Sequence, residues 1–156
     1  MTEVNGLRLA YRGFVTGLAG AYVWLAIAML ASTVGLFDPV APLRPIAALL
    51  VPAATTSAAM AFALGFVLVQ LGGGLVGMVF AYFFGRFFTA RPTLTIAAAC
   101  FALLAWSLLA AGLVPLGVPD LGTRLAPLVA SLAYGIMLGV GLPLRGDVLR
   151  TPGASA

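Results

Sequence analysis

The sequence predicts an all-α membrane protein with four transmembrane helices, arranged as two antiparallel hairpins with both termini in the cytoplasm. Two observations lead to this fold class. Hydrophobic residues make up 63% of the chain and charged residues 8%, whereas about a quarter of the residues in soluble domains are charged. The charged side chains also lie only at the edges of apolar runs, and each uncharged run reaches the roughly 20 residues that a helix needs to cross a bilayer.

The charges that interrupt the apolar pattern place the four spans within a single transmembrane domain. The first span ends where Asp38 and Pro39 stop both the apolar run and the helix. The second follows residues 55–57, whose hydroxyls can cap its first turn, and the short connection 86–92 makes it an antiparallel neighbour of the third. Pro127 is tolerated in the first turn of the fourth. The predicted spans are residues 13–36, 58–84, 93–114 and 125–144.

The connection between the first two spans is too rich in proline for a regular helix. Pro39, Pro42, Pro45 and Pro52 interrupt it. The segment 45–52 is apolar but too short to cross a membrane. We expect an interfacial or partly re-entrant turn there.

The arginines predict the orientation of the spans. With a cytoplasmic amino terminus, six of the eight arginines lie inside and only Arg44 and Arg124 lie outside, in line with the positive-inside rule. Asp38 and Asp120 share the outer loops with these two arginines, and we interpret both pairs as topology markers that contribute little as ion pairs. The composition is typical of a high-GC prokaryote, so we expect the cytoplasmic (inner) membrane.

The partners follow from the same composition. The arginines are scattered and do not form the basic stripe that nucleic-acid binding needs. The expected surroundings are therefore the lipid bilayer and either other membrane protein subunits or further copies of the chain.

Small residues with a spacing of about four form lines along three of the predicted spans. Such a line lets a neighbouring backbone approach closely. We expect these residues to pack helices, within the bundle as the leading interpretation, or against a partner subunit or second copy as the alternative. The predicted helix-packing residues are Gly13 and Gly17, then Gly73, Gly77, Ala81 and Gly85, then Ser131, Gly135 and Gly139.

Two further features lie in the middle of the second span. Gly72 to Gly74 are consecutive glycines, each costing about 1 kcal/mol relative to alanine in an exposed helix. They predict a helix irregularity or a ligand contact. Gln70, one turn away, is the only amide within a span. We expect its side chain to hydrogen-bond a neighbouring helix, with contact to a quinone, lipid or pigment as the alternative.

Both tryptophans lie away from the interfaces where this residue is usually found. Trp24 is near the middle of the first span and Trp106 near the middle of the third. Each indole N–H then needs a partner inside the bundle. We interpret both as packing residues, with a stacking site for a pigment or quinone as the alternative. The candidate hydrogen-bond partners are Thr16, Tyr22, Ser107 and Tyr134.

The residue types that are missing exclude several classes of function. The chain has no histidine and one cysteine, which excludes haem ligation by histidine, the usual zinc and copper sites and iron–sulfur clusters. No charged side chain lies within a span, so the carboxylates of a proton pump are missing. We therefore predict no catalytic residue, no metal site and no cofactor, while a bound lipid, quinone or pigment stays compatible with the sequence.

Placing the first hairpin over the second aligns Ala28 with Ala105 and Gly35 with Gly112. A true repeat would relate the hairpins by a pseudo-twofold axis along the membrane normal. Because the matching letters are the commonest in this chain, we favour coincidence.

The sequence also resembles a known group of proteins. Residues 12–20, Arg-Gly-Phe-Val-Thr-Gly-Leu-Ala-Gly, and residues 132–139, Leu-Ala-Tyr-Gly-Ile-Met-Leu-Gly, resemble small four-helix prokaryotic integral membrane proteins of unknown function. The resemblance implies a four-helix bundle and carries no catalytic residue.

The leading hypothesis of function is a non-catalytic integral membrane protein, acting through small-residue helix packing as an accessory or assembly subunit of a larger membrane complex. The alternative is a small carrier or channel with a pathway near Gln70 and Gly72 to Gly74, which requires a polar or hydrated cavity there. A lipid-modifying or quinone-linked enzyme is a third hypothesis. Its polar site would have to come from Arg86, Arg91 or the outer acid–arginine pairs.

Overall fold

The computed structural model describes residues 6–36, 38–52, 55–113 and 125–144, and these residues form helices and turns without a strand. Helices α1, α3 and α4 are long and apolar enough to cross a membrane, and α5 is a shorter apolar helix of 17 residues. This part of the chain therefore fits the all-α membrane class. The elements are α1 (Gly6–Leu36), α2 (Arg44–Ala47), α3 (Ala58–Phe83), the 3-10 helix η2 (Gly85–Phe87), α4 (Arg91–Leu113) and α5 (Leu125–Gly141).

The ends of the helices differ in places from the ends of the predicted spans. α1 begins at Gly6, well before the predicted start at Gly13, because the helix continues past the apolar run and through Arg8. α5 ends at Gly141, before the predicted end at residue 144. α3 begins after Ser57, whose Oγ accepts a hydrogen bond of 3.2 Å from the backbone N–H of Met60, as a helix cap does.

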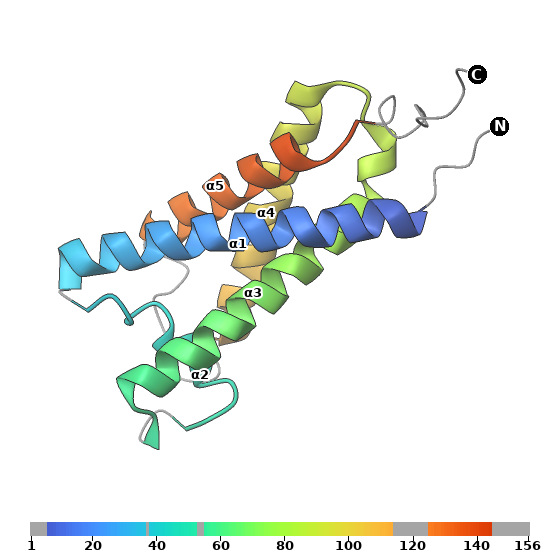
Figure 1. The fold of residues 1–156 in the computed structure, drawn as a ribbon. Helices are drawn as coiled ribbons and strands as arrows, with labels where there is room; N and C mark the ends of the chain where they lie inside the picture. The colour runs from blue at the N-terminus through green and yellow to red at the C-terminus, as the bar shows by residue number, and fades with distance from the viewer. Residues whose placement is uncertain (1–5, 37, 53–54, 114–124, 145–156) are drawn as a thin grey trace, which may run out of the picture.

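Helix α1 is the central element of the arrangement. It packs along α3 on one side and along α5 on the other, and α4 packs along α5 (Figure 1). α3 and α4 touch mainly at the end near η2, where the Phe101 ring lies 5.2 Å from that of Phe80 and 5.7 Å from that of Phe84. Elsewhere the two helices make few close backbone contacts.

The crossing of α1 and α3 brings two backbones into direct contact. A Cβ added at Gly17 would overlap the carbonyl oxygen of Gly73, and one added at Gly77 would lie 2.8 Å from the Cα of Gly17. A Cβ added at Gly13 would overlap the carbonyl oxygen of Gly77. Such an approach gains dispersion energy and weak Cα–H···O contacts that bulkier residues would prevent.

The crossing of α4 and α5 is built in the same way. A Cβ added at Gly135 would lie 2.5 Å from the Cα of Ala99, and one added at Gly139 would overlap the backbone of Thr95. Thr95 and Ala99 of α4 therefore contact the glycines of α5 in the same way that Gly13 and Gly17 of α1 contact the glycines of α3. The crossings thus make Gly17 of the first hairpin equivalent to Ala99 of the second. The sequence match that pairs Gly35 with Gly112 uses a different offset, so it does not pair structurally equivalent residues.

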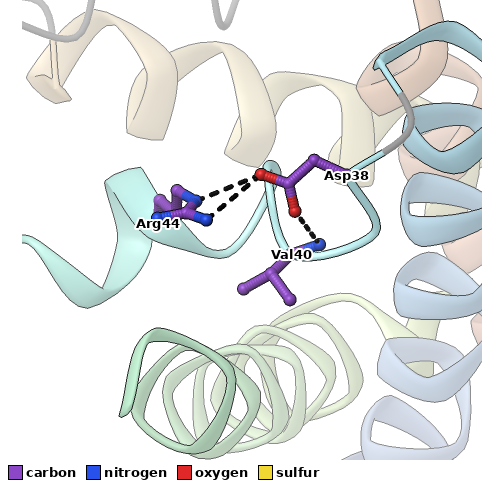
Figure 2. A network of polar contacts seen from close by, with 3 residues as sticks. All are labelled: Asp38, Val40 and Arg44. Carbon is purple, nitrogen blue, oxygen red and sulfur yellow. Dashed lines mark hydrogen bonds and ion pairs between the residues drawn. The ribbon is translucent and has the colours of Figure 1, made fainter. Parts of the chain in front are cut away.

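The segment before α3 folds back onto that helix. Leu43 is fully buried, and a Cβ added at Gly65 would lie 2.7 Å from its Cβ. An ion pair of 3.2 Å joins Arg44 to Asp38, which also accepts a 3.0 Å hydrogen bond from the backbone N–H of Val40 (Figure 2). This half-exposed pair joins the first residue of α2 to the turn that precedes it. It contributes about 0–1 kcal/mol to the free energy of unfolding. The second predicted pair, Asp120 with Arg124, lies outside the described residues.

The end of α5 is held by the first residue of α4. The guanidinium of Arg91 donates hydrogen bonds to the carbonyl oxygens of Val140, at 3.0 Å, and of Leu142. Carbonyl groups in the last turn of a helix have no partner within the helix, and a cation there also favours the helix dipole. Arg91 thus ties the start of α4 to the end of α5.

The glycine at position 77 is expected to be essential to the α1–α3 crossing. Gly77→Ala should lower the free energy of unfolding by about 1–3 kcal/mol, because its methyl group would overpack against Gly17. Gly72→Ala is the matched control, since no atom lies within 4 Å of a Cβ added there, and it should leave that free energy unchanged or slightly higher. Denaturant unfolding of the detergent-purified variants measures both. Equal losses in the two variants would contradict the close crossing.

Candidate functional site

A cavity of about 560 Å³ lies between α3 and α4. α3 and α4 form its two walls, α1 and α5 contribute residues between them, and Ile46 and Leu49 line it from the α2 segment. Its volume is within the roughly 300–1,000 Å³ that is usual for small-molecule sites. The cavity adjoins Gly72 and Gly73, in the middle of the second predicted span.

The lining of the cavity is almost entirely apolar. Leucine, valine, alanine and glycine make up most of it, and none of the described residues that line it is charged. The lining residues with polar side-chain atoms are Trp24, Trp106, Ser131 and Tyr134. The hydrogen bonds of these four residues therefore determine what polar group a ligand would meet.

The indole N–H of Trp24 has a hydrogen-bond acceptor on α5. Its indole Nε1–H donates a 3.1 Å hydrogen bond to Ser131 Oγ, which in turn donates to the carbonyl oxygen of Pro127 at 2.8 Å. Ser131 is 3% exposed, so this chain of hydrogen bonds is buried. Ser131 therefore joins the α1 and α5 helices through a hydrogen bond, beyond the packing role expected of it.

None of the residues expected as acceptors bonds a tryptophan N–H group, since Trp24 donates to Ser131 and Trp106 has no acceptor among the described residues. Thr16 and Ser107 donate to carbonyl oxygens of their own helices, those of Arg12 and Leu103. The ring of Tyr22 packs edge-on against Phe66. The hydroxyls of Thr16 and Ser107 thus bond within their own helices, and the Tyr22 ring packs on α3.

Tyr134 fills the contact between α1 and α5. Its hydroxyl donates a 2.6 Å hydrogen bond to the carbonyl oxygen of Gly73 on α3. Its ring lies so close to Gly20 of α1 that an added Cβ there would be 2.8 Å from Cδ2. One side chain thus links α5 to both α1 and α3.

The indole N–H of Trp106, unlike that of Trp24, has no hydrogen-bond partner among the described residues. The two rings lie 5.4 Å apart between centroids, and Trp106 is only 6% exposed. Its Nε1–H has no hydrogen-bond acceptor among the residues that the structure describes. Leaving a buried donor unpaired costs about 1–3 kcal/mol.

Gln70 is the second buried polar group without a partner. It is 8% exposed, and neither Oε1 nor Nε2 has a hydrogen-bond partner in the described part of the chain. The hydrogen bond expected to a neighbouring helix is therefore not made by any described residue. Gln70 does not line the cavity, although Val69 and Gly73 beside it do.

The three consecutive glycines do not interrupt the helix. α3 is continuous from Ala58 to Phe83, so the expected irregularity is wrong. Gly73 and Gly74 are needed by packing, since added Cβ atoms would lie 2.6 Å from Ala21 and from Phe14 of α1. Gly72 instead opens onto the cavity, with nothing within 4 Å of an added Cβ. It is the one glycine of the three whose missing side chain leaves space.

The predicted lines of small residues lie at contacts within the chain. Gly13, Gly17, Gly73 and Gly77 meet at the α1–α3 crossing, and Ala81 extends this contact against Gly13. Gly85 in η2 lies 3.4 Å, measured from an added Cβ, from Leu9 of α1. Gly135 and Gly139 meet α4, and Ser131 meets Trp24. The chain itself therefore occupies the faces that were also considered for a partner.

The described residues hold no group of three histidine, cysteine, aspartate or glutamate side chains that could bind a metal. Comparison of the chain with protein-family models, with curated proteins and with solved structures finds no match. The chemistry of the site therefore follows from its geometry. An apolar cavity of this size can bind an apolar molecule.

Replacing Gln70 by an apolar residue of similar shape tests whether its amide has a partner. Gln70→Met should raise the free energy of unfolding by about 1 kcal/mol, because an unsatisfied buried amide is removed while its volume is kept. Denaturant unfolding in detergent measures the change. A loss of stability would show that the amide is hydrogen-bonded in the folded protein.

Proposed function

We propose that this chain is a non-catalytic integral membrane protein that binds an apolar molecule of the bilayer in the cavity between α3 and α4. The single observation that carries the proposal is the cavity itself, with its apolar lining and its position between helices long enough to cross a membrane. Such a lining favours an alkyl chain or a ring over an ion or a polar solute. A carrier for apolar molecules is compatible with this geometry.

The cavity bears on the two hypotheses drawn from the sequence. A channel for a polar solute near Gln70 needs polar groups along its path, and the lining supplies few. An accessory subunit needs a surface for its partner, and the small-residue lines that motivated this role lie at contacts within the chain. An assembly role would therefore have to use other helix faces.

For the membrane arrangement we propose four spans, with α5 as the fourth, and both termini in the cytoplasm of a prokaryotic cell. At 17 residues α5 is about 25 Å long, which is short for a hydrocarbon core of about 30 Å. Local thinning of the bilayer accommodates such a difference. Arg86, stacked 5.0 Å from the Phe87 ring, and Arg91 would mark the inner side, and the pair of Asp38 and Arg44 the outer side.

Two exposed threonines at opposite ends of α3 test the orientation. In a Cys100→Ser background, a membrane-impermeant maleimide should label Thr55→Cys in intact cells. The matched variant Thr89→Cys should react only after the cells are permeabilised, because it lies on the cytoplasmic side. Labelling of Thr89→Cys in intact cells would reverse the proposed orientation.

The tryptophans provide a direct measurement of binding, since both of them line the cavity. An alkyl bromide such as 1-bromododecane should quench their fluorescence in detergent with a saturable component. Gly72→Phe should weaken this component at least tenfold, because the new ring enters open space in the cavity.

Gly112→Phe is the matched control, since Gly112 also has nothing near an added Cβ and does not line the cavity. It should bind the bromide as the natural sequence does. Quenching that never saturates, or that Gly72→Phe leaves unchanged, would rule out binding in this cavity.

A further inference from the structure

The cavity between α3 and α4 is open to its surroundings on one side. Its back is made by buried residues of α1 and α5, among them Trp24 and Ser131. The lining residues Leu49, Leu108 and Leu109 are instead exposed. Exposed leucines on helices of this kind face lipid tails, so the cavity is continuous there with the hydrocarbon of the bilayer.

The end of the cavity toward η2 is closed. The last lining residues at this end are Val76 of α3 and Ala102 of α4. One turn beyond Val76, Phe80 is 1% exposed, and its ring lies 5.2 Å from that of Phe101, the neighbour of Ala102. This contact between rings occupies the space between the two helices, so a bound molecule cannot extend past it.

The opposite end of the cavity lies at the α2 segment. From Val76 the lining runs back along α3 to Leu68, about 12 Å at a rise of about 1.5 Å per residue. Ile46 and Leu49 continue it, in the segment that contacts α3 at Gly65. The cavity therefore extends from the middle of α3 toward the end of the bundle that carries α2.

A pair of opposite charges marks this end. Arg44 is the first residue of the short helix that also carries Ile46, and its ion pair with Asp38 is partly exposed (Figure 2). The two charges cancel, so together they favour a molecule that carries both signs. A zwitterionic headgroup has a phosphate for the guanidinium and an ammonium group for the carboxylate.

Building on the proposed function, we infer that the cavity holds one acyl chain of a zwitterionic phospholipid from the leaflet that contains α2. The methyl end of the chain lies toward Phe80 and Phe101, and the headgroup lies outside the cavity, at Asp38 and Arg44. The second chain stays in the bilayer, along the exposed leucines. This direction matches that of a bilayer lipid, whose headgroup is at the surface and whose chain ends are near the middle.

Two photoreactive lysophosphatidylethanolamines test the direction of the chain, one with a diazirine at the methyl end and one with a diazirine next to the ester. After illumination in lipid nanodiscs, peptide mass spectrometry locates the crosslinks. The first probe should label mainly residues 76–80 and 101–102, and the second mainly residues 44–49 and 108–109. Equal or reversed distributions would overturn the inference. Because the natural sequence is used, the result does not depend on how a variant folds.

Competition of lysophosphatidylethanolamine against 1-bromododecane, followed by tryptophan quenching, tests the headgroup contact. Arg44→Gln should weaken binding of the lysolipid about threefold, the size expected of one exposed charge contact. It should leave binding of 1-bromododecane unchanged, because this molecule has no charged headgroup. Arg86→Gln is the matched control and should leave both affinities unchanged, since it removes an exposed arginine in η2, at the closed end.

The outcomes distinguish the inference from the function on which it rests. Saturable binding of 1-bromododecane that the lysolipid does not displace, or a lysolipid affinity that Arg44→Gln leaves unchanged, overturns the inference while binding in the cavity stands. Absence of saturable binding of 1-bromododecane overturns both.

Discussion

The backbone contact between α1 and α3 is the constraint on which the rest of the structure depends. Lipid offers no hydrophobic drive for helices to associate, so close approach must supply the attraction. Gly17 and Gly77 allow this approach on one side of α1, and Gly20 receives the Tyr134 ring on another side. α1 therefore becomes the central helix that holds both α3 and α5. α4 packs mainly along α5 and makes few close contacts with α3.

The same kind of crossing occurs twice, but its surroundings are filled differently. At the α1–α5 contact a tyrosine occupies the space and a serine completes the hydrogen bond of Trp24. At the equivalent α4–α3 contact, counting from Gly73 and Gly135 makes Gly72 and Val69 the counterparts of Tyr134 and Ser131, and a cavity lies there. Four-helix packing alone does not require this difference, since Gly72 has no neighbour that would exclude a side chain. The asymmetry between the hairpins is what gives the fold a place for a ligand.

The polar groups inside the bundle limit the chemistry that this place can perform. The hydroxyls of Ser131 and Tyr134 already donate to backbone carbonyl oxygens, and the cavity lining in the described part of the chain contains no charged group. An apolar lining of this kind favours an apolar molecule over an ion or a polar solute.

The sequence by itself determined the helical membrane class, the approximate limits of the long helices and the residues at which backbones approach. These features follow from composition and from spacing along one helix, which are local properties. Only the tertiary structure decided that Ser131 is the partner of Trp24, that Arg91 caps α5 and that Gly72, alone among three glycines, opens onto a cavity. Each of these depends on the register between helices. An apolar sequence with small residues at many positions allows several registers of similar pattern, and the close crossings select one of them.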